Sequence, residues 1–301
     1  MQQKHSLKDW IVATRPWSFT ASGLTVLTAL FYLRWLVGEV DWQNGLLAVL
    51  GIILFHAAGN MWSDYFDYNS GVDRVEGAYS SDSSLVRGVF TPKQLRNYAL
   101  TLLVPAIAVG LFLLFRSGWT LLWIGLGGLI CTLGYPYLKY RALGDLTILM
   151  AYGFLPAIGT SYVALGVIDW RVLWIALPVG LLVDAILHAN NTRDMATDRA
   201  ASIHTMAHGL GKRASVVLYI LEQLLPFCWV VICAPFGKFP FLALIVVAVM
   251  RVALANCVMM RTYNESGNPA DIASLDQRSA QTQLLFCVVM IIALSVDAWI
   301  L

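Results

Sequence analysis

The sequence predicts an all-α membrane protein, built as a bundle of nine transmembrane helices. Of its 301 residues, 58% are hydrophobic and 13% are charged, whereas a soluble domain is about half apolar and about a quarter charged. A helix needs about 20 mostly apolar residues to cross a bilayer, because each backbone N–H and C=O must be paired within the hydrocarbon. Apolar runs of this length recur along the whole chain, so the bilayer must be its main solvent.

Nine runs meet this criterion, and short polar stretches separate them. In chain order they are predicted at 17–37, 44–66, 97–115, 119–138, 144–166, 170–191, 213–233, 239–260 and 281–301. They form a single polytopic domain over residues 1–301. The polar, basic N-terminal segment lacks the apolar core and cleavage site of a signal peptide, so it is expected to lie along the membrane surface.

The distribution of Lys and Arg gives the orientation. Fifteen of these residues fall in the N-terminal segment and in the loops on its side of the membrane, and four fall on the opposite side. The positive-inside rule therefore places the N-terminus and the long loops in the cytoplasm, and a bacterial inner membrane is the expected location. The basic residues form no dense patch, so nucleic acid is not an expected partner.

Two long acidic loops lie on that cytoplasmic side, at about 67–96 and 192–212, and they are expected to form a cap over a site. Each loop follows a polar helix end, and the two helix ends resemble one motif used twice, with Asp64 and Asp194 130 positions apart. Positions three or four apart share a helix face. The motifs therefore predict two polar stripes, one of Asn60, Asp64 and Asp67 and the other of Asn191, Asp194 and Asp198.

Carboxylates gathered at the edge of a low-dielectric region need cationic partners or a divalent metal. Oxygen ligands with room for water suit Mg²⁺, which commonly bridges carboxylates to a substrate phosphate. A phosphorylated substrate is therefore expected. The alternative is that these residues only cap helix ends and contact lipid headgroups, but two similar clusters on one side make that interpretation less favourable.

These residues carry a resemblance. The stretch from Asn60 to Asp73 and the run from Asn190 to Arg199 resemble the two aspartate-rich motifs of the UbiA superfamily of intramembrane prenyltransferases. Nine helices agree with that family's bundle. The forms Asp64-Tyr-Phe-Asp67 and Asn190-Asn191-x-Arg193-Asp194 most resemble the menaquinone branch, whose members prenylate 1,4-dihydroxy-2-naphthoate.

The resemblance implies Mg²⁺-dependent transfer of a polyprenyl group from its diphosphate to a small aromatic quinone precursor. It implies that Mg²⁺ is held by Asn60, Asp64, Asp67, Asn191, Asp194 and Asp198, the four aspartates being the catalytic set. The segment from Gly134 to Arg141 resembles the family's Tyr-Pro loop. Candidate substrate contacts are Arg87, Arg193, Tyr135, Lys139 and Arg141, since Arg and Lys bind phosphate oxygens.

Three further polar residues, His56, His188 and Asp184, lie on the helices that carry the motifs. The histidines are expected to make hydrogen bonds, and Asp184 is expected either to be functional or to pair with a donor. One departure from the family pattern stands out, because Ile203 occupies the position where a lysine is usual.

Two other functions stay open. One is a divergent member of the same superfamily that uses another acceptor or cyclises its isoprenoid. The other is a transporter or lipid-phosphate carrier, because duplicated helices with intramembrane polar groups also occur in transporters. Transporter sites lie near the bilayer midplane, whereas these acids are predicted at one face.

Overall fold

The computed structural model describes residues 5–69, 71, 84–200 and 202–300. Within these ranges, nine helical segments are long and apolar enough to span a membrane, which confirms the predicted bundle. The first four spans are formed by η1 and α2 (Pro16–Ser18 and Phe19–Val37), α3 (Trp42–Asn69), α4 (Pro92–Ser117) and α5 (Thr120–Lys139).

The fifth span combines three elements, α6 (Gly144–Ile148), a π-helical turn η4 (Leu149–Phe154) and α7 (Leu155–Leu165). The last four spans are η5 and α8 (Trp170–Val172 and Leu173–Arg193), α11 and η6 (Lys212–Cys233 and Ala234–Phe236), η7 and α12 (Phe241–Val249 and Met250–Ser266), and η8 and α13 (Pro269–Ile272 and Leu275–Ile300). Three short helices lie outside the spans, α1 (Leu7–Ala13), α9 (Met195–Ala200) and α10 (Met206–Leu210).

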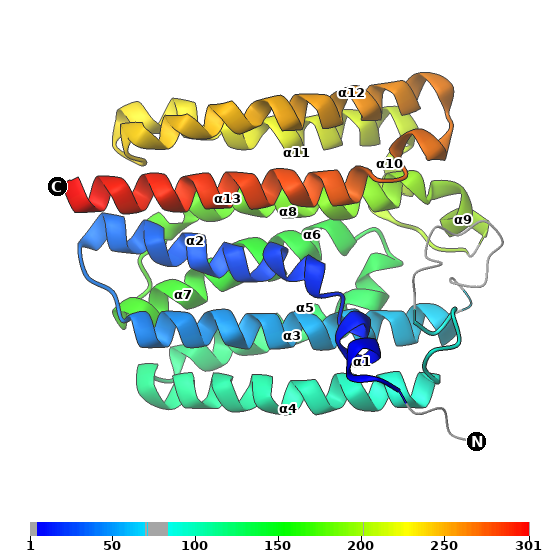
Figure 1. Ribbon diagram of the computed structural model, residues 1–301, viewed down its shortest axis with the longest axis horizontal. Helices are drawn as coiled ribbons and strands as arrows, with labels where there is room; N and C mark the ends of the chain where they lie inside the picture. The colour runs from blue at the N-terminus through cyan, green and yellow to red at the C-terminus, as the bar shows by residue number, and fades with distance from the viewer. Residues whose placement is uncertain (1–4, 70, 72–83, 201, 301) are drawn as a thin grey trace.

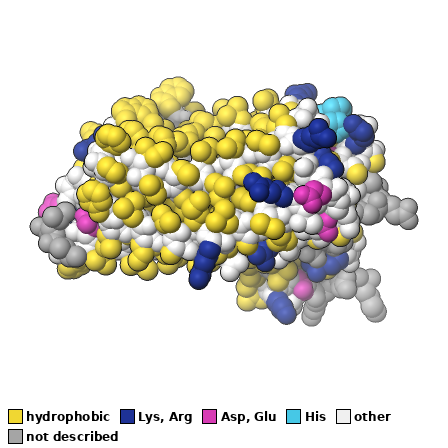
Figure 2. All heavy atoms as spheres, turned by 90° about the horizontal axis from the view of Figure 1, so that it is seen from above, with side chains coloured by type: hydrophobic (Ala, Val, Ile, Leu, Met, Phe, Trp, Pro, Cys, Tyr) yellow, Lys and Arg dark blue, Asp and Glu magenta, His cyan; other side chains and the backbone are white. Residues whose placement is uncertain are grey.

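The long helices run side by side, with α11 and α12 along one edge of the bundle and α4 along the other (Figure 1). The short helices α1, α9 and α10 lie toward the same end, and the last turns of α13 lie at the opposite end. The surface carries a broad hydrophobic band, and most of the charged side chains in view gather at the end that holds the short helices (Figure 2).

Two spans begin earlier than predicted because their first turns are polar. A capping box starts α4, in which Thr91 caps the backbone N–H of Gln94 and Gln94 caps that of Thr91, with Pro92 at the first helical position. The last span begins at Pro269 rather than 281. Its polar turn faces protein, since Ser279 is buried and shares a 2.7 Å hydrogen bond with the Tyr219 hydroxyl.

The largest core cluster lies among α2, α8, α11, η7 and α13, and it includes Leu33, Leu182, Phe227 and Phe286. These side chains are at most 1% exposed. The core holds the C-terminal half of the bundle against α2. It therefore fixes α8, which carries the second polar motif, relative to the N-terminal helices.

Candidate active site

The two predicted polar stripes meet at the charged end of the bundle. The first stripe lies on the last turns of α3, and the second lies on the end of α8 and on α9. The pKa of Asp198 is raised to about 6, mainly by burial; Lys139 acts to lower it, and the charges of Asp194 and Asp67 act to raise it. Since Asp67 belongs to the first stripe and Asp198 to the second, the two stripes are close enough to interact electrostatically.

Cationic side chains pair with three of the four aspartates. Arg15 Nη2 lies 2.7 Å from Asp64 Oδ1, and Lys139 Nζ lies 3.6 Å from Asp67 Oδ2. Arg193 donates from Nε and Nη2 to the two oxygens of Asp194, both at 2.8 Å. Among the described residues, Asp198 has no ion pair, although it is only 6% exposed. The carboxylates thus outnumber these cations, and the site favours a further positive charge.

The turn before α2 brings Arg15 to the site, and sequence reasoning did not select this residue. Arg15 precedes Pro16 and has a left-handed backbone with φ of 55°, which is uncommon for a non-glycine residue. The Nδ2 of Asn60 donates to the Thr14 carbonyl and to the Ser18 hydroxyl, both at 3.0 Å. Asn60 therefore holds the turn in place on α3. An Arg-Pro pair at the start of the first span was the available signal.

The Tyr-Pro segment of α5 approaches the first stripe. Lys139 is the last residue of α5, and the next residue, Tyr140, donates its hydroxyl to Asp67 at 2.5 Å. Tyr135 lies one turn earlier, within electrostatic range of Lys139 and Asp67. The Arg141 backbone pairs with that of His204, which follows the second stripe. This segment therefore links the two motifs.

Two other predicted contacts lie further out. The Arg141 side chain is exposed, and so is Arg87, which lies in the turn before α4. Ile203, at the usual lysine position, is 3% exposed, and its backbone N–H donates to the Asp198 carbonyl at 2.8 Å. Asp73 lies outside the described residues, as do residues 70 and 72–83 of the loop 67–96, so the predicted cap is not described there.

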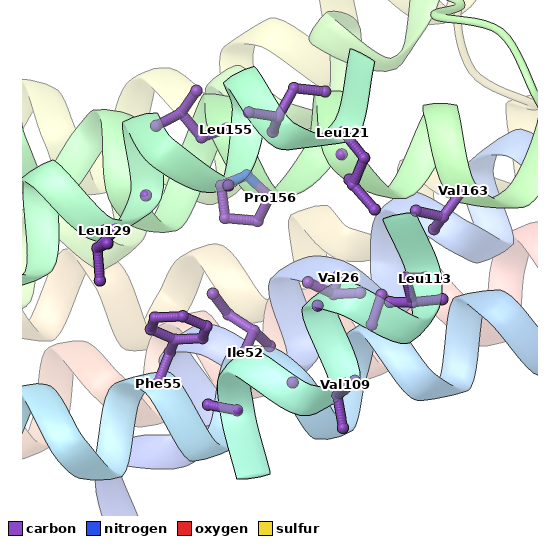
Figure 3. Close-up of a pocket in the computed structure, with 18 of the residues that line it drawn as sticks. Val26, Ile52, Phe55, Val109, Leu113, Leu121, Leu129, Leu155, Pro156 and Val163 are labelled. Atoms are coloured by element: carbon purple, nitrogen blue, oxygen red, sulfur yellow. The ribbon is translucent and has the colours of Figure 1, made fainter. Parts of the chain in front are cut away.

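An apolar cavity of about 310 Å³ adjoins this site (Figure 3). Its walls come from α2, α3, α4, α5, η4 and α7, and Figure 3 shows Ile52, Phe55 and Leu129 among the side chains that border it. His56 lines one part of the cavity. It lies one turn before Asn60 on α3, so the cavity extends from the polar motif into the hydrocarbon region.

His56 is fixed in place by the N-terminal span. Its Nδ1 lies 2.9 Å from the Ser22 hydroxyl, and its Nε2 lies 3.4 Å from the Ser18 hydroxyl. Ser18 also accepts the hydrogen bond from Asn60. The end of the cavity is therefore connected to the first stripe through hydrogen bonds, which supports the expected hydrogen-bonding role of His56.

Comparison with known proteins decides the family. The model of the UbiA prenyltransferase family matches residues 22–274. The chain belongs to the UbiA prenyltransferase family. It is 34% identical over 224 residues to UbiA prenyltransferase domain-containing protein 1 of Danio rerio, and 30% identical over 290 residues to the Mus musculus protein of the same name. The matches cover 72% and 94% of this chain and 66% and 82% of those relatives.

Solved structures show the same fold. A UbiA homolog from Aeropyrum pernix K1 in its apo form has a TM-score of 0.71 at 15% identity, and the alignment covers 93% of this chain and 97% of that one. A UbiA homolog from Archaeoglobus fulgidus bound to GPP and Mg²⁺ has a TM-score of 0.58 at 14% identity, covering 94% and 99%. These likenesses confirm the UbiA-type helical bundle that the sequence predicted.

The side chains of this UbiA family member suit a hard divalent cation. Asn60 and Asn191 each donate from Nδ2, Asn191 to Asp145 at 3.4 Å, which leaves the amide oxygens available as ligands. Together with the four aspartates they offer only oxygen donors, as Mg²⁺ prefers. The burial of Asp198, without a cationic partner among the described residues, is the structural feature that a bound cation would relieve.

A second group of buried acids lies deeper, behind Asn191. Asp145 on α6 and Glu222 on α11 are each 2% exposed, and His188 Nδ1 lies 2.7 Å from Asp145 Oδ1. The predicted hydrogen-bonding role of His188 is thus confirmed. Sequence reasoning singled out Asp184 but missed Asp145 and Glu222. For Glu222 the available signal was a carboxylate within an apolar run, as for Asp184, whereas Asp145 stands at the start of the predicted span 144–166.

Proposed function

We propose that the protein is a Mg²⁺-dependent prenyltransferase that moves a polyprenyl group from its diphosphate to an aromatic quinone precursor, with 1,4-dihydroxy-2-naphthoate as the preferred acceptor. The observation that carries this proposal is the meeting of four carboxylates and three cationic side chains beside an apolar cavity. A diphosphate needs metal ions and cationic side chains, and an isoprenoid chain needs an apolar wall, so the two regions suit the two ends of one donor.

The polar end of the donor is assigned to the two stripes. Mg²⁺ would be held by the predicted set of Asn60, Asp64, Asp67, Asn191, Asp194 and Asp198, and when bound it supplies charge stabilisation for the departing diphosphate. Arg15, Lys139 and Arg193 already lie against these aspartates. They are placed to bind phosphate oxygens once a metal takes over part of the carboxylate charge.

The outer predicted contacts have a lesser role in this proposal. Arg87 and Arg141 are exposed near the charged end, where they attract the anionic headgroup. Tyr135 borders Lys139 and Asp67 and lies where an acceptor ring would approach the donor. Lys139 supplies an ammonium group close to Asp198, which compensates for Ile203 at the usual lysine position.

The apolar end of the donor is assigned to the cavity that begins at His56. In the reaction, the bond between C1 of the prenyl chain and the diphosphate oxygen breaks, and the diphosphate leaves with the electron pair. A carbon of the electron-rich ring then forms the new bond to C1, and the ring regains aromaticity when that carbon loses its proton or, where it carries the carboxylate, CO₂. The apolar walls exclude water from the allylic cation, which would otherwise be hydrolysed.

The comparisons support the donor class more than the acceptor. Structures of a UbiA homolog from Archaeoglobus fulgidus are bound to GPP and Mg²⁺ or to DMAPP and Mg²⁺, whereas the relatives of similar sequence are named for a UbiA prenyltransferase domain, which specifies no acceptor. The elements that carry the two stripes, the last turns of α3, the end of α8 and the short helix α9, lie at one end of the bundle (Figure 1), which favours an enzyme over a carrier with a midplane site. The excess of Lys and Arg supports a cytoplasmic N-terminus and a site at the cytoplasmic face.

The test is turnover by the purified protein in detergent or lipid, with Mg²⁺ and a labelled polyprenyl diphosphate. The acceptors offered are 1,4-dihydroxy-2-naphthoate, 4-hydroxybenzoate, homogentisate, or none. A prenylated naphthoquinol supports the proposal in full. Diphosphate release with another ring, or with none, overturns the acceptor and favours the divergent enzyme or an isoprenoid cyclase. No Mg²⁺-dependent release from any donor overturns the enzyme and favours the carrier.

A further inference from the structure

We infer that the buried group of Asp145, His188 and Glu222 is a second metal site, which takes a divalent transition-metal ion such as Zn²⁺ and is separate from the proposed Mg²⁺ site. One ligand atom from each of the three residues lies within 4.8 Å of the others, and all three residues are buried. They come from α6, α8 and α11. The site would therefore join three spans that are distant in sequence.

The hydrogen bonds of His188 prepare it as a ligand. Its Nε2 lies 3.2 Å from the Ser215 carbonyl oxygen, and because a carbonyl only accepts, this nitrogen carries the hydrogen. The lone pair of the neutral ring is then on Nδ1, which lies 2.7 Å from Asp145 Oδ1. Metal-binding histidines typically donate their other N–H to a backbone carbonyl or carboxylate, which fixes the tautomer. An ion bound by both residues would take the place of the hydrogen bond between Nδ1 and Asp145.

Asp184 is an independent indication that the group needs a cation. It is 6% exposed, and its Oδ1 has no hydrogen-bond partner among the described residues. It lies one turn before His188 on the same face of α8, and it is within electrostatic range of Asp145 and Glu222. Glu222 Oε2 also lacks a hydrogen-bond partner within the described part of the chain. Buried carboxylates without donors are costly in a membrane interior, and a divalent ion satisfies several of them at once.

The ligand types decide which ion fits. An imidazole nitrogen together with carboxylates suits Zn²⁺ or a similar transition metal, whereas Mg²⁺ prefers oxygen ligands and keeps several waters. The Asp145 carboxylate also accepts a hydrogen bond from Asn191 Nδ2 at 3.4 Å. An ion on Asp145 would therefore hold Asn191, a proposed Mg²⁺ ligand, in a fixed orientation. The inference itself stands without the proposed activity, since metal binding is measured directly.

The first test is the metal content of the purified full-length protein after incubation with Zn²⁺ in excess Mg²⁺, followed by removal of free ions. The wild type is expected to retain about one Zn²⁺ per chain, and Glu222→Gln is expected to lose it. Asp64→Asn, in the proposed Mg²⁺ site, should retain the ion. So should Asp297→Asn, since Asp297 lies on α13 and bonds Trp35. A wild type without Zn²⁺, or equal loss in Asp64→Asn, overturns the inference.

Thermal unfolding separates metal loss from misfolding. Glu222→Gln keeps the side-chain size and removes a buried charge, so it should fold. Zn²⁺ is expected to raise the unfolding temperature of the wild type, and a strong chelator to reverse the rise, because an ion that binds only the folded state stabilises it. Glu222→Gln should respond to neither. If neither Zn²⁺ nor the chelator changes the unfolding temperature of the wild type, the group binds no metal ion, and this result also overturns the inference.

Discussion

The two polar motifs look alike in sequence but obtain their charge partners in different ways. The first lies on one uninterrupted helix, α3, and its cations come from other elements, Arg15 before α2 and Lys139 at the end of α5. The second lies where α8 ends and α9 begins, and Asp194 pairs with its own neighbour, Arg193. The first motif therefore depends on tertiary packing for its charge partners, whereas in the second motif Asp194 is paired locally and Asp198 has no ion pair among the described residues.

The histidines that precede the two motifs also differ in their hydrogen-bond partners. His56 is held by two serines of the N-terminal span, whereas His188 is held by a buried carboxylate and a backbone carbonyl. His56 contacts only neutral hydroxyl groups and lines the apolar cavity. His188 contacts the Asp145 carboxylate and belongs to the buried acidic group. A repeated motif thus serves a ligand cavity in one half of the bundle and a buried polar cluster in the other.

The largest expected effect comes from removing one carboxylate of either motif. Asp64→Asn and Asp194→Asn are each expected to lower kcat/KM by at least about a hundredfold, since each removes part of the charge that holds the metal at the leaving group. Steady-state turnover measures the loss, and size-exclusion profiles check that the bundle remains folded. Retained turnover in one variant only would show that the two motifs do not act together on one donor.

The next largest effect is expected from removing the arginine that each motif pairs with, Arg15 from another element and Arg193 from the second motif itself. Arg15→Gln removes the cation paired with Asp64, whose side chain is 7% exposed. Arg193→Gln removes the cation paired with Asp194, whose side chain is 23% exposed. We expect Arg15→Gln to lower kcat/KM by about tenfold to a hundredfold and the unfolding temperature as well, because the stranded carboxylate is the more buried one. Arg193→Gln is expected to cost less.

A double variant tests whether Arg15 acts through Asp64. If the loss of stability in Arg15→Gln comes from the unpaired carboxylate, then Arg15→Gln combined with Asp64→Asn should recover the unfolding temperature while remaining inactive. A double variant as unstable as the single one would show that Arg15 stabilises the turn in another way. A larger cost from Arg193→Gln than from Arg15→Gln would contradict the comparison between the motifs.

Much of this arrangement was predictable from the sequence, for identifiable reasons. Apolar runs located the nine spans because the bilayer requires such runs. Helical spacing put Asn60, Asp64 and Asp67 on one face. The partners were not predictable in the same way, because Arg15 is 49 residues from Asp64 and Asp145 is 43 from His188, and no local pattern encodes contacts across such separations. The cavity walls could not be predicted either, since residues facing a cavity and residues facing lipid are equally apolar.

Glycines in the cavity wall offer a way to test the assignment of the prenyl chain. A Cβ added at Gly125 or Gly128 of α5 would meet no atom within 4 Å, and both residues line the cavity. Gly128 lies closer to the charged end than Gly125. We expect Gly128→Leu to lower kcat/KM for long donors relative to short ones by about tenfold, since each excluded methylene loses about 0.8 kcal/mol. Gly125→Leu is expected to affect only longer donors.

A variant on the other face of α5 provides the control. Ile130 is 66% exposed and does not line the cavity, so Ile130→Phe should leave the preference for donor length unchanged. The measurement is competition between labelled donors of graded length. If Gly125→Leu and Gly128→Leu leave the preference unchanged, or if Ile130→Phe alters it equally, then the chain is bound elsewhere and the assignment of the cavity is wrong.

The smallest expected effect concerns the hydroxyl that supports the first motif. Tyr140→Phe removes the donor to Asp67 but keeps Lys139 beside it, so we expect kcat/KM to fall by about threefold to tenfold, within the range for one hydrogen bond to a charged group. Tyr137→Phe is the matched control, because Tyr137 is 54% exposed and its ring packs on Phe66. A larger loss in Tyr137→Phe would mean that the aromatic packing of this segment, rather than the contact with Asp67, positions the first motif. A larger loss in Tyr140→Phe than in Tyr137→Phe would instead show that even a single neutral donor contributes to the first motif, whose partners all come from other elements.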